Sequence, residues 1–176
     1  MKKLLFLIVG LTYSLTTTAQ KIALSNKINI NLPSKSEKLS KDQILAFVNE
    51  RFKNDEIALT AAQNTNPDHT YVADNVLVTL FYGNKSVNEN YLLQTKKGLD
   101  EMSRKDKSYT SSIETIKNNK VLVINQTAGN VGYYHFYCYD NKNSSAVNGR
   151  LEFNIADKAK ATKILSDILN GVEFAK

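Results

Sequence analysis

The residues with the clearest chemical potential lie together in the stretch GYYHFYCYD, residues 132–140. This stretch contains His135 and Cys138, the only cysteine of the chain. Side chains of a β-strand alternate between its two faces, so these two residues, three positions apart, point away from each other. A catalytic thiolate needs its base within hydrogen-bond reach. The spacing therefore excludes a Cys–His dyad, and we expect Cys138 to be buried beside Tyr134 and Phe136 as a small hydrophobe.

The other face of the same strand carries four side chains that could bind a ligand. They are Tyr133, His135, Tyr137 and Tyr139. Tyrosine offers a large contact area and a hydroxyl group, and the adjoining loop Asp140–Ser145 could assist, as loops beside rigid strands often do. In the alternative interpretation a helix covers this face and leaves only Tyr139 near the rim. Both interpretations stay open, and the four residues are our candidate ligand-binding residues.

Other catalytic and metal-binding patterns are weak or absent in the sequence. A histidine-based metal site would have to use Asp68, His69 and Asp74, for which a surface turn is the simpler explanation. The sequence contains no GxSxG, HExxH, Walker or GxGxxG motif. We therefore predict no catalytic residues, no metal site and no cofactor, and we favour a non-catalytic protein over an enzyme.

The first residues, MKKLLFLIVGLTYSLTTTA, have the pattern of a secretory signal peptide. Lys2 and Lys3 form a basic start, an apolar segment follows, and Thr17 and Ala19 are the small residues that precede a cleavage site. The apolar segment is too short for a membrane span, which needs about 20 residues. We expect cleavage after Ala19, which would leave a periplasmic or secreted chain of residues 20–176 with no transmembrane segment.

The mature chain would form a single domain of 157 residues, long enough to bury a hydrophobic core. Loss of the two leader lysines lowers the formal net charge from +6 to +4. The remaining lysines are scattered, which is typical of a solvated surface; attraction to an anionic envelope surface or an acidic protein is the alternative. Export argues against nucleic acid as a partner and favours an envelope or secreted protein.

Hydrophobic periodicity predicts the order of helices and strands. Helices are expected over residues 41–53 and 90–105 and from Asp157 to Gly171, the last with Ile164, Leu165, Ile168 and Leu169 inward. Strands are expected over 27–32, 57–62, 71–82, 109–116, 120–127, the stretch containing His135, and a segment ending at Ile155, with Asn118–Asn119 as a turn and Asn148–Gly149 as a turn or bulge. The predicted class is α+β, a mostly antiparallel sheet covered by helices on both faces.

The ending GRLEFNIADKAKATKILSDILNGVEF, residues 149–174, resembles the closing strand and amphipathic helix of PsbP-like and DcrB-like domains. The segment INLP, residues 30–33, resembles their opening strand and proline. The resemblance concerns the order of elements over most of residues 27–175 and implies an α/β/α sandwich. Domains of this kind are generally non-catalytic accessory subunits, envelope proteins or adaptors, so the resemblance implies a binding role and assigns no functional residue.

The sequence thus leads to the expectation of an exported, non-catalytic binding or accessory protein of the bacterial envelope. Two other functions are compatible with the same residues. One is a periplasmic immunity protein that neutralises a delivered toxin. The other is a carboxylate-dependent hydrolase, which would need two carboxylates converging within about 5–10 Å in a deep pocket.

Overall fold

The computed structural model describes residues 19–53, 55–83, 90–140, 142 and 144–175, so the predicted signal peptide, except Ala19, lies outside the described residues. The strands are β1 (Gln20–Ser25), β2 (Ile28–Leu32), β3 (Glu37–Lys38), β4 (Thr70–Ala73), β5 (Val76–Gly83), β6 (Thr110–Ile116), β7 (Asn119–Ala128), β8 (Val131–Tyr139), β9 (Ala146–Asn154) and β10 (Glu173–Phe174). The helices are α1 (Lys41–Arg51), α2 (Glu56–Asn64), α3 (Tyr91–Met102) and α4 (Lys158–Gly171), and the short 3-10 helices are η1 (Pro67–His69) and η2 (Ile155–Asp157). Within this described part, no helix has the length and apolar character needed to cross a membrane.

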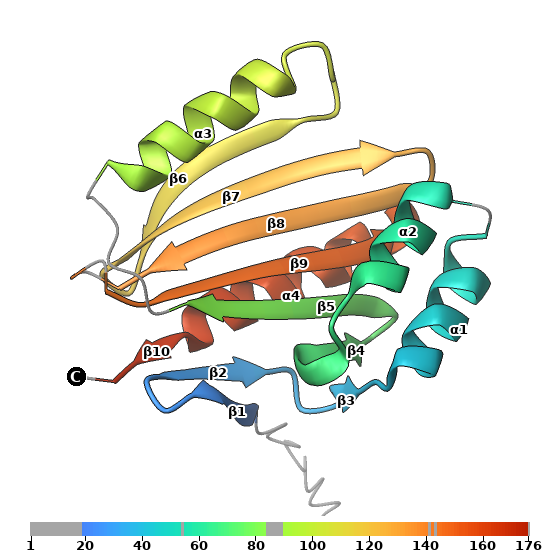
Figure 1. Cartoon of the computed structure of the whole chain (residues 1–176), viewed down its shortest axis with the longest axis horizontal. Coiled ribbons are helices and arrows are strands. Elements are labelled where there is room, and N and C mark those ends of the chain that lie inside the picture. Colours follow the sequence, from blue (N-terminus) through green and yellow to red (C-terminus); the bar gives the residue numbers. More distant parts are fainter. Residues whose placement is uncertain (1–18, 54, 84–89, 141, 143, 176) are drawn as a thin grey trace, which may run out of the picture.

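Seven strands form one antiparallel sheet in the order β3-β4-β5-β9-β8-β7-β6 (Figure 1). A smaller antiparallel sheet, β1-β2-β10, brings the C-terminal strand against the N-terminal hairpin. Strands β6 to β9 follow one another along the chain and pair with their neighbours, whereas β5 pairs with the distant β9. The centre of the large sheet therefore joins the two halves of the chain.

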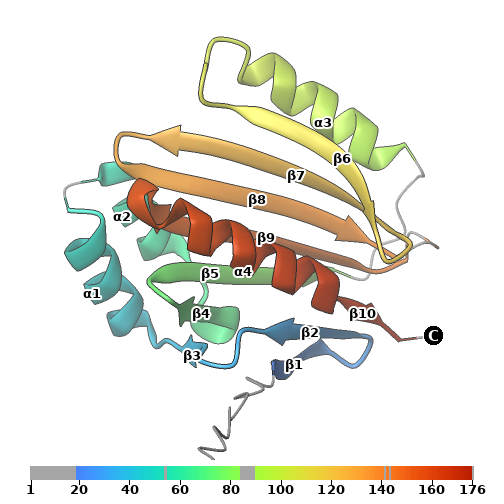
Figure 2. The same ribbon diagram turned by 180° about the vertical axis from the view of Figure 1, so that it is seen from behind.

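Helices cover both faces of the large sheet. Helix α4 crosses one face and packs on it together with the small sheet (Figure 2). On the opposite face, α1 and α2 cover one end of the strands, and α3 runs along the β6 edge (Figure 1), where its cluster includes residues of β7, β8 and β9. The predicted α+β class, with a mostly antiparallel sheet covered on both faces, is confirmed.

Strand β8 alternates as the sequence predicts. Tyr134, Phe136 and Cys138 belong to the core beneath α4, whereas Tyr133 and Tyr139 belong to cores on the opposite face. Cys138 is fully buried, and this burial raises the pKa of its thiol to about 12. Because only the thiolate is a strong nucleophile, Cys138 acts here as a packing residue.

Helix α4 supplies an apolar stripe to its face of the sheet. The buried side chains recur at intervals of three and four residues, as predicted; they are Ala161, Ile164, Leu165, Ile168 and Leu169. The helix ends at Gly171, where an added Cβ would lie 2.6 Å from the Cβ of Asn31 on β2. A side chain at this position would separate α4 from the small sheet.

The predicted strand over residues 57–62 is wrong, because this segment belongs to helix α2. The Asp55 carboxylate caps the helix by accepting a hydrogen bond from the backbone nitrogen of Ala58 (2.8 Å). Ala58 and Ala62, one turn apart, are fully buried, whereas Ile57 is 64% exposed. A short apolar segment fits the periods of both a helix and a strand. Here the cap and the two alanines determine the helix.

The single long strand predicted over residues 71–82 is also wrong, because a tight turn divides it into β4 and β5. Asp74 and Asn75 form the turn, with φ angles of 46° and 69°. Two consecutive residues in the left-handed region match the twist of a hairpin, and Asp and Asn tolerate this region better than most residues. Apolar residues on both sides of the turn conceal it in the sequence.

Two further turn predictions are corrected by the register of the strands. Lys117 and Asn118, rather than Asn118 and Asn119, form the turn between β6 and β7, with φ angles of 48° and 71°. Asn148 and Gly149 form neither a turn nor a bulge, because both pair with β8 inside β9. The ring of Phe136 packs over Gly149, where an added Cβ would lie 2.2 Å from Cε1 of the ring.

We expect Gly149→Ala to lower the free energy of unfolding by about 1–3 kcal/mol, because the added methyl group must displace the ring of Phe136. Gly98→Ala is the matched control: Gly98 lies inside α3 with nothing within 4 Å of an added Cβ. Alanine favours a helix over glycine by about 1 kcal/mol, so the control should gain stability. Urea denaturation measures both values, and equal stability of the two variants would contradict the packing of Phe136 on Gly149.

Candidate functional site

The sheet face opposite α4 carries a regular grid of side chains on its three central strands, β5, β9 and β8. Residues that are directly paired on antiparallel strands share a face and lie side by side. The rows of this grid are Leu77, Glu152 and Tyr133; Thr79, Arg150 and His135; and Phe81, Asn148 and Tyr137.

Helices cover the two ends of this face and leave its middle accessible. Tyr133, with Leu77, is buried in the core beneath α1 and α2. Tyr139, beyond the grid, is buried and meets Tyr91 of α3 edge-on, with 5.4 Å between the ring centroids. The middle holds five exposed or partly buried side chains, which we call the open strip: Phe81, His135, Tyr137, Asn148 and Arg150. From strand spacing and rise, the strip measures roughly 10 Å by 7 Å.

The structure divides the four candidate ligand-binding residues into two pairs. His135 and Tyr137 lie in the open strip, where a binding role stays a prediction. Tyr133 and Tyr139 are 7% and 5% exposed, so helices cover them, and Tyr139 does not lie at an open rim. In the adjoining loop Asp140–Ser145, positions 141 and 143 lie outside the described residues.

An ion pair lies at the inner edge of the open strip. Glu152 is 1% exposed, and its Oε1 atom lies 2.8 Å from Nη2 of Arg150. The same Nη2 donates a hydrogen bond to Oγ1 of Thr65 at the end of α2 (3.2 Å). Burial raises the pKa of Glu152, and the charge of Arg150 opposes this effect. The guanidinium group thus links the sheet to α2 while remaining partly exposed.

Unsatisfied polar atoms are concentrated in this grid. Among the described residues, eight buried side-chain polar atoms have no hydrogen-bond partner, and six of them belong to the grid. These six are Oγ1 of Thr79, Oη of Tyr133, Oδ1 of Asn148, Nε of Arg150 and both carboxylate oxygens of Glu152, although Oε1 of Glu152 lies in the ion pair with Nη2 of Arg150. Folded proteins pair nearly all such groups. The grid therefore contains polar atoms that are shielded from the surface and have no hydrogen-bond partner among the described residues.

His135 is held neutral by its surroundings. Its ring stacks on that of Tyr133, with 6.4 Å between centroids and 17° between planes, and it pairs with Arg150 on β9. Burial, and then the positive charge of Arg150, lower the pKa of His135 to about 4. Burial also raises the pKa of Tyr133. At neutral pH the strip therefore presents uncharged rings beside one cation whose counterion is Glu152.

The carboxylates near this face are engaged in contacts within the protein. Glu152 is the one carboxylate in the grid. Asp55, whose negative charge contributes to the raised pKa of Glu152, already uses its side chain to cap α2. Across the part of the chain that the structure describes, no three His, Cys, Asp or Glu side chains form a possible metal site. His69, considered above for metal binding, instead meets Tyr82 edge-on at 5.7 Å between centroids.

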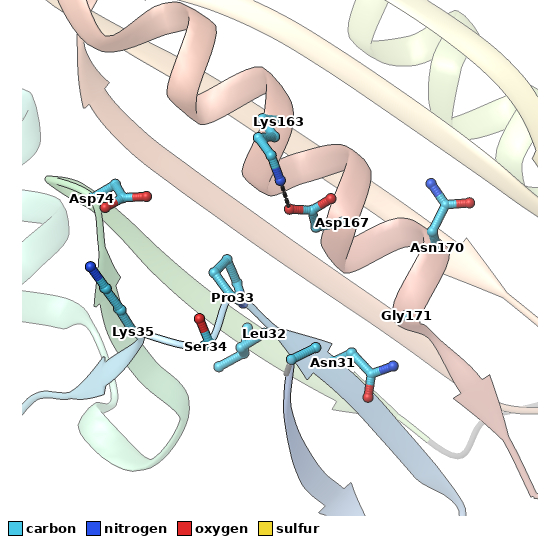
Figure 3. A pocket seen from close by; sticks show the side chains of 11 residues that line it. Asn31, Leu32, Pro33, Ser34, Lys35, Asp74, Lys163, Asp167, Asn170 and Gly171 are labelled. Carbon is cyan, nitrogen blue, oxygen red and sulfur yellow. Dashed lines mark hydrogen bonds and ion pairs between the residues drawn. The ribbon is translucent and has the colours of Figure 1, made fainter. Parts of the chain in front are cut away.

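A groove lies between α4 and the connection from β2 to β3 (Figure 3). This groove has a volume of about 600 Å³. Lys163 and Asp167 of α4 form an ion pair on one wall (2.6 Å), and Lys35 and Asp74 lie on the other. The basic and acidic side chains balance, and an exposed ion pair contributes little energy. The groove is therefore a weaker candidate than the open strip.

Sequence reasoning missed four residues of this site: Phe81, Asn148, Arg150 and Glu152. The polar residues at alternate positions 148, 150 and 152, separated by glycine and leucine, were the available signal, since alternation places them on one face. Phe81 could not be placed, because its position depends on the pairing of β5 with β9.

No protein-family model and no curated protein matches the sequence. Similar solved structures include cyanobacterial PsbP from Synechocystis sp. PCC 6803, with a TM-score of 0.48, 4% identity, and coverage of 90% of this chain and 93% of PsbP. They also include a protein from Bacteroides thetaiotaomicron VPI-5482, with a TM-score of 0.46, 12% identity and coverage of 85% of this chain. This chain spans 45% of the length of that protein. A PsbP protein, from the family that the sequence resembles, is therefore among the similar solved structures.

We expect the free energy of unfolding to fall as the pH is lowered from about 6.5 to about 4, partly because of His135. In this window the unfolded chain binds a proton at His135 that the folded chain does not, so acid favours unfolding. At about 1.4 kcal/mol per tenfold change in proton affinity, the loss approaches about 3 kcal/mol near pH 4.

Urea denaturation at several pH values gives the free energy of unfolding of the parent protein and of His135→Gln. The difference between their pH dependences isolates the contribution of His135. The variant should lose less stability than the parent on acidification. His69→Gln, which removes the other histidine, is the control for loss of an imidazole. An unchanged pH dependence in His135→Gln would contradict a neutral, buried His135.

Proposed function

We propose that this chain is an exported, non-catalytic binding or accessory protein of the bacterial envelope, and that the open strip is the centre of its binding surface. The observation that carries this proposal is the accessible group of aromatic and polar side chains between the helix-covered ends of the sheet. Phe81 is 45% exposed on this face and pairs with partly buried Asn148, which pairs on its other side with Tyr137.

The composition of the strip fits contact with a protein. Aromatic residues and arginine are enriched at the energetically important positions of protein interfaces. Asn148 and Arg150 add partly exposed polar side chains to the rings of the strip. A stable interface buries about 800 Å² per partner, far more than a strip of roughly 10 Å by 7 Å. The exposed surfaces of α2 and α3 on either side must therefore contribute to the interface.

The same geometry supports the non-catalytic role in this proposal. A carboxylate-dependent hydrolase needs two free carboxylates with distinct roles. In the described grid, Glu152 is buried against Arg150, and its neighbour Asp55 is engaged as a helix cap.

Site-specific photo-crosslinking tests the binding surface. A benzophenone amino acid at position 81 should give a discrete cross-linked product with an envelope protein in the producing cells. The same amino acid at position 163, on the exposed side of α4, should not. Phe81→Ala should weaken capture of the identified partner at least tenfold and shift the thermal midpoint by less than about 2 °C, because the ring is half exposed. Cross-linking at position 163 alone would place the binding surface elsewhere.

Export has a separate test. Expressed in a bacterium with its complete sequence, the protein should be recovered from the periplasm or medium with Gln20 as its first residue. Replacing Leu7 and Ile8 by aspartate should keep the full-length chain inside the cell, since a charged segment no longer functions as a signal peptide. Recovery of the full-length chain from the cytoplasm in both cases would contradict export.

A further inference from the structure

Strand β6 forms one edge of the large sheet, and no strand in the described part of the chain pairs with its outer side. Within the described residues its backbone pairs only with β7, through seven consecutive residue pairs without a bulge. Natural edge strands are commonly short or interrupted by proline, bulges or charges. The sequence TSSIETI has no proline and one charged residue, Glu114. At the opposite edge, by contrast, β3 has two residues.

The turn geometry identifies the backbone groups that point outward. In a hairpin with a two-residue turn at Lys117 and Asn118, the flanking pair Ile116 and Asn119 exchanges hydrogen bonds. Alternate residues of β6 then bond to β7, and the amides and carbonyls of Ser111, Ile113 and Thr115 point away from the sheet. The amide of Tyr109, two residues before Ser111, agrees with this alternation: it donates a hydrogen bond to the carbonyl oxygen of Asp106 in the preceding loop (3.3 Å) and not to β7.

Helix α3 runs alongside this edge (Figures 1 and 2) and is tied to it by Asp100. The Asp100 carboxylate accepts hydrogen bonds from the hydroxyls of Ser111 (2.5 Å) and Tyr109 (3.0 Å). Along the helix surface next to Asp100 runs a shallow groove of about 550 Å³, lined by Leu93, Lys96, Lys97, Asp100, Glu101 and Arg104. Leu93 in this groove is 60% exposed.

We propose that β6 and the α3 groove together form a docking site for an extended, acidic and apolar segment of a partner protein. The segment adds to the sheet as an eighth strand by pairing with the outward backbone groups of β6. Its apolar side chains contact Leu93 and the aliphatic parts of the neighbouring lysines. Its acidic side chains face Lys97 and Arg104.

The charges of α3 determine which occupant fits. Lys96 is neutralised by Asp100 (2.5 Å), but among the described residues neither Lys97 nor Arg104 forms an ion pair. A second copy pairing through β6 would bring two α3 helices together on the same face, with these cations opposed, which is unfavourable. An acidic segment complements them, because Glu101, the other charge of the groove without an ion pair among the described residues, offsets only one of the two cations. Because α3 also borders the open strip, the variants of β6 distinguish this proposal from the one above: they change the outward backbone groups of β6 and leave the open strip intact.

A synthetic ten-residue peptide of alternating valine and glutamate, blocked at both ends and labelled with a fluorophore, is the probe. Fluorescence anisotropy should show binding to the parent protein that weakens as salt is added. Ile113→Pro removes one outward amide and should weaken binding at least tenfold, whereas the control Ile113→Val should bind as the parent does. The double variant Lys97→Glu/Arg104→Glu should also weaken binding at least tenfold. A peptide with lysine in place of glutamate should bind at least tenfold more weakly to the parent.

Circular dichroism establishes that each variant is folded, and Thr115→Pro replaces Ile113→Pro if the latter unfolds. Absence of binding to the parent, or equal binding to the proline and valine variants, would overturn the proposal. Light scattering gives a further decisive outcome. A parent dimer that dissociates in the proline variant would show that a second copy, and not an acidic segment, occupies the edge.

Discussion

The contact between Phe136 and Gly149 sets the register of β8 against β9, and the character of both sheet faces follows from that register. The ring occupies the place of a side chain on the neighbouring strand, so only glycine can pair with it. A shift of one residue would exchange the two faces of a strand. In the observed register, Phe136 and Cys138 face the core beneath α4, and Arg150 and Glu152 are directed to the opposite side.

The two faces differ in how completely they are covered. Beneath α4, apolar side chains from both sheets form one continuous core. On the opposite face the apolar clusters are separate, one beneath α1 and α2 and one beneath α3. The polar grid lies between them, where burial changes the pKa values of His135 and Glu152 in directions that disfavour charge on each. Continuous apolar packing thus lies on the face beneath α4, and the buried and partly buried polar side chains lie on the opposite face.

The sequence was informative where a long, regular pattern exists, and less so where structure depends on pairing between distant segments. The alternation of β8 and the period of α4 place Cys138 and Ile168 correctly without a structure. The segment around Ala58 was ambiguous because a short apolar run satisfies two periods. Only part of the open strip could be predicted from the sequence. The alternation of β8 places His135 and Tyr137 on one face, but the position of Arg150 beside His135 depends on the pairing of β8 with β9. Whether helices cover Tyr133 or leave it open is likewise a tertiary property.

The small sheet has a consequence for the order in which the chain can fold. Strand β2 pairs with β10, and Lys21 forms an ion pair with Glu173 (2.6 Å), so the first described strands find partners in the last one. Strand β5 pairs with β9, although α3 and strands β6, β7 and β8 lie between them in the chain. During synthesis from the N-terminus, the early segments must therefore wait for late ones, and contacts of such long sequence separation form slowly. A chain exported as proposed would remain loosely structured while it is translocated and would complete its sheets only after its last residues arrive.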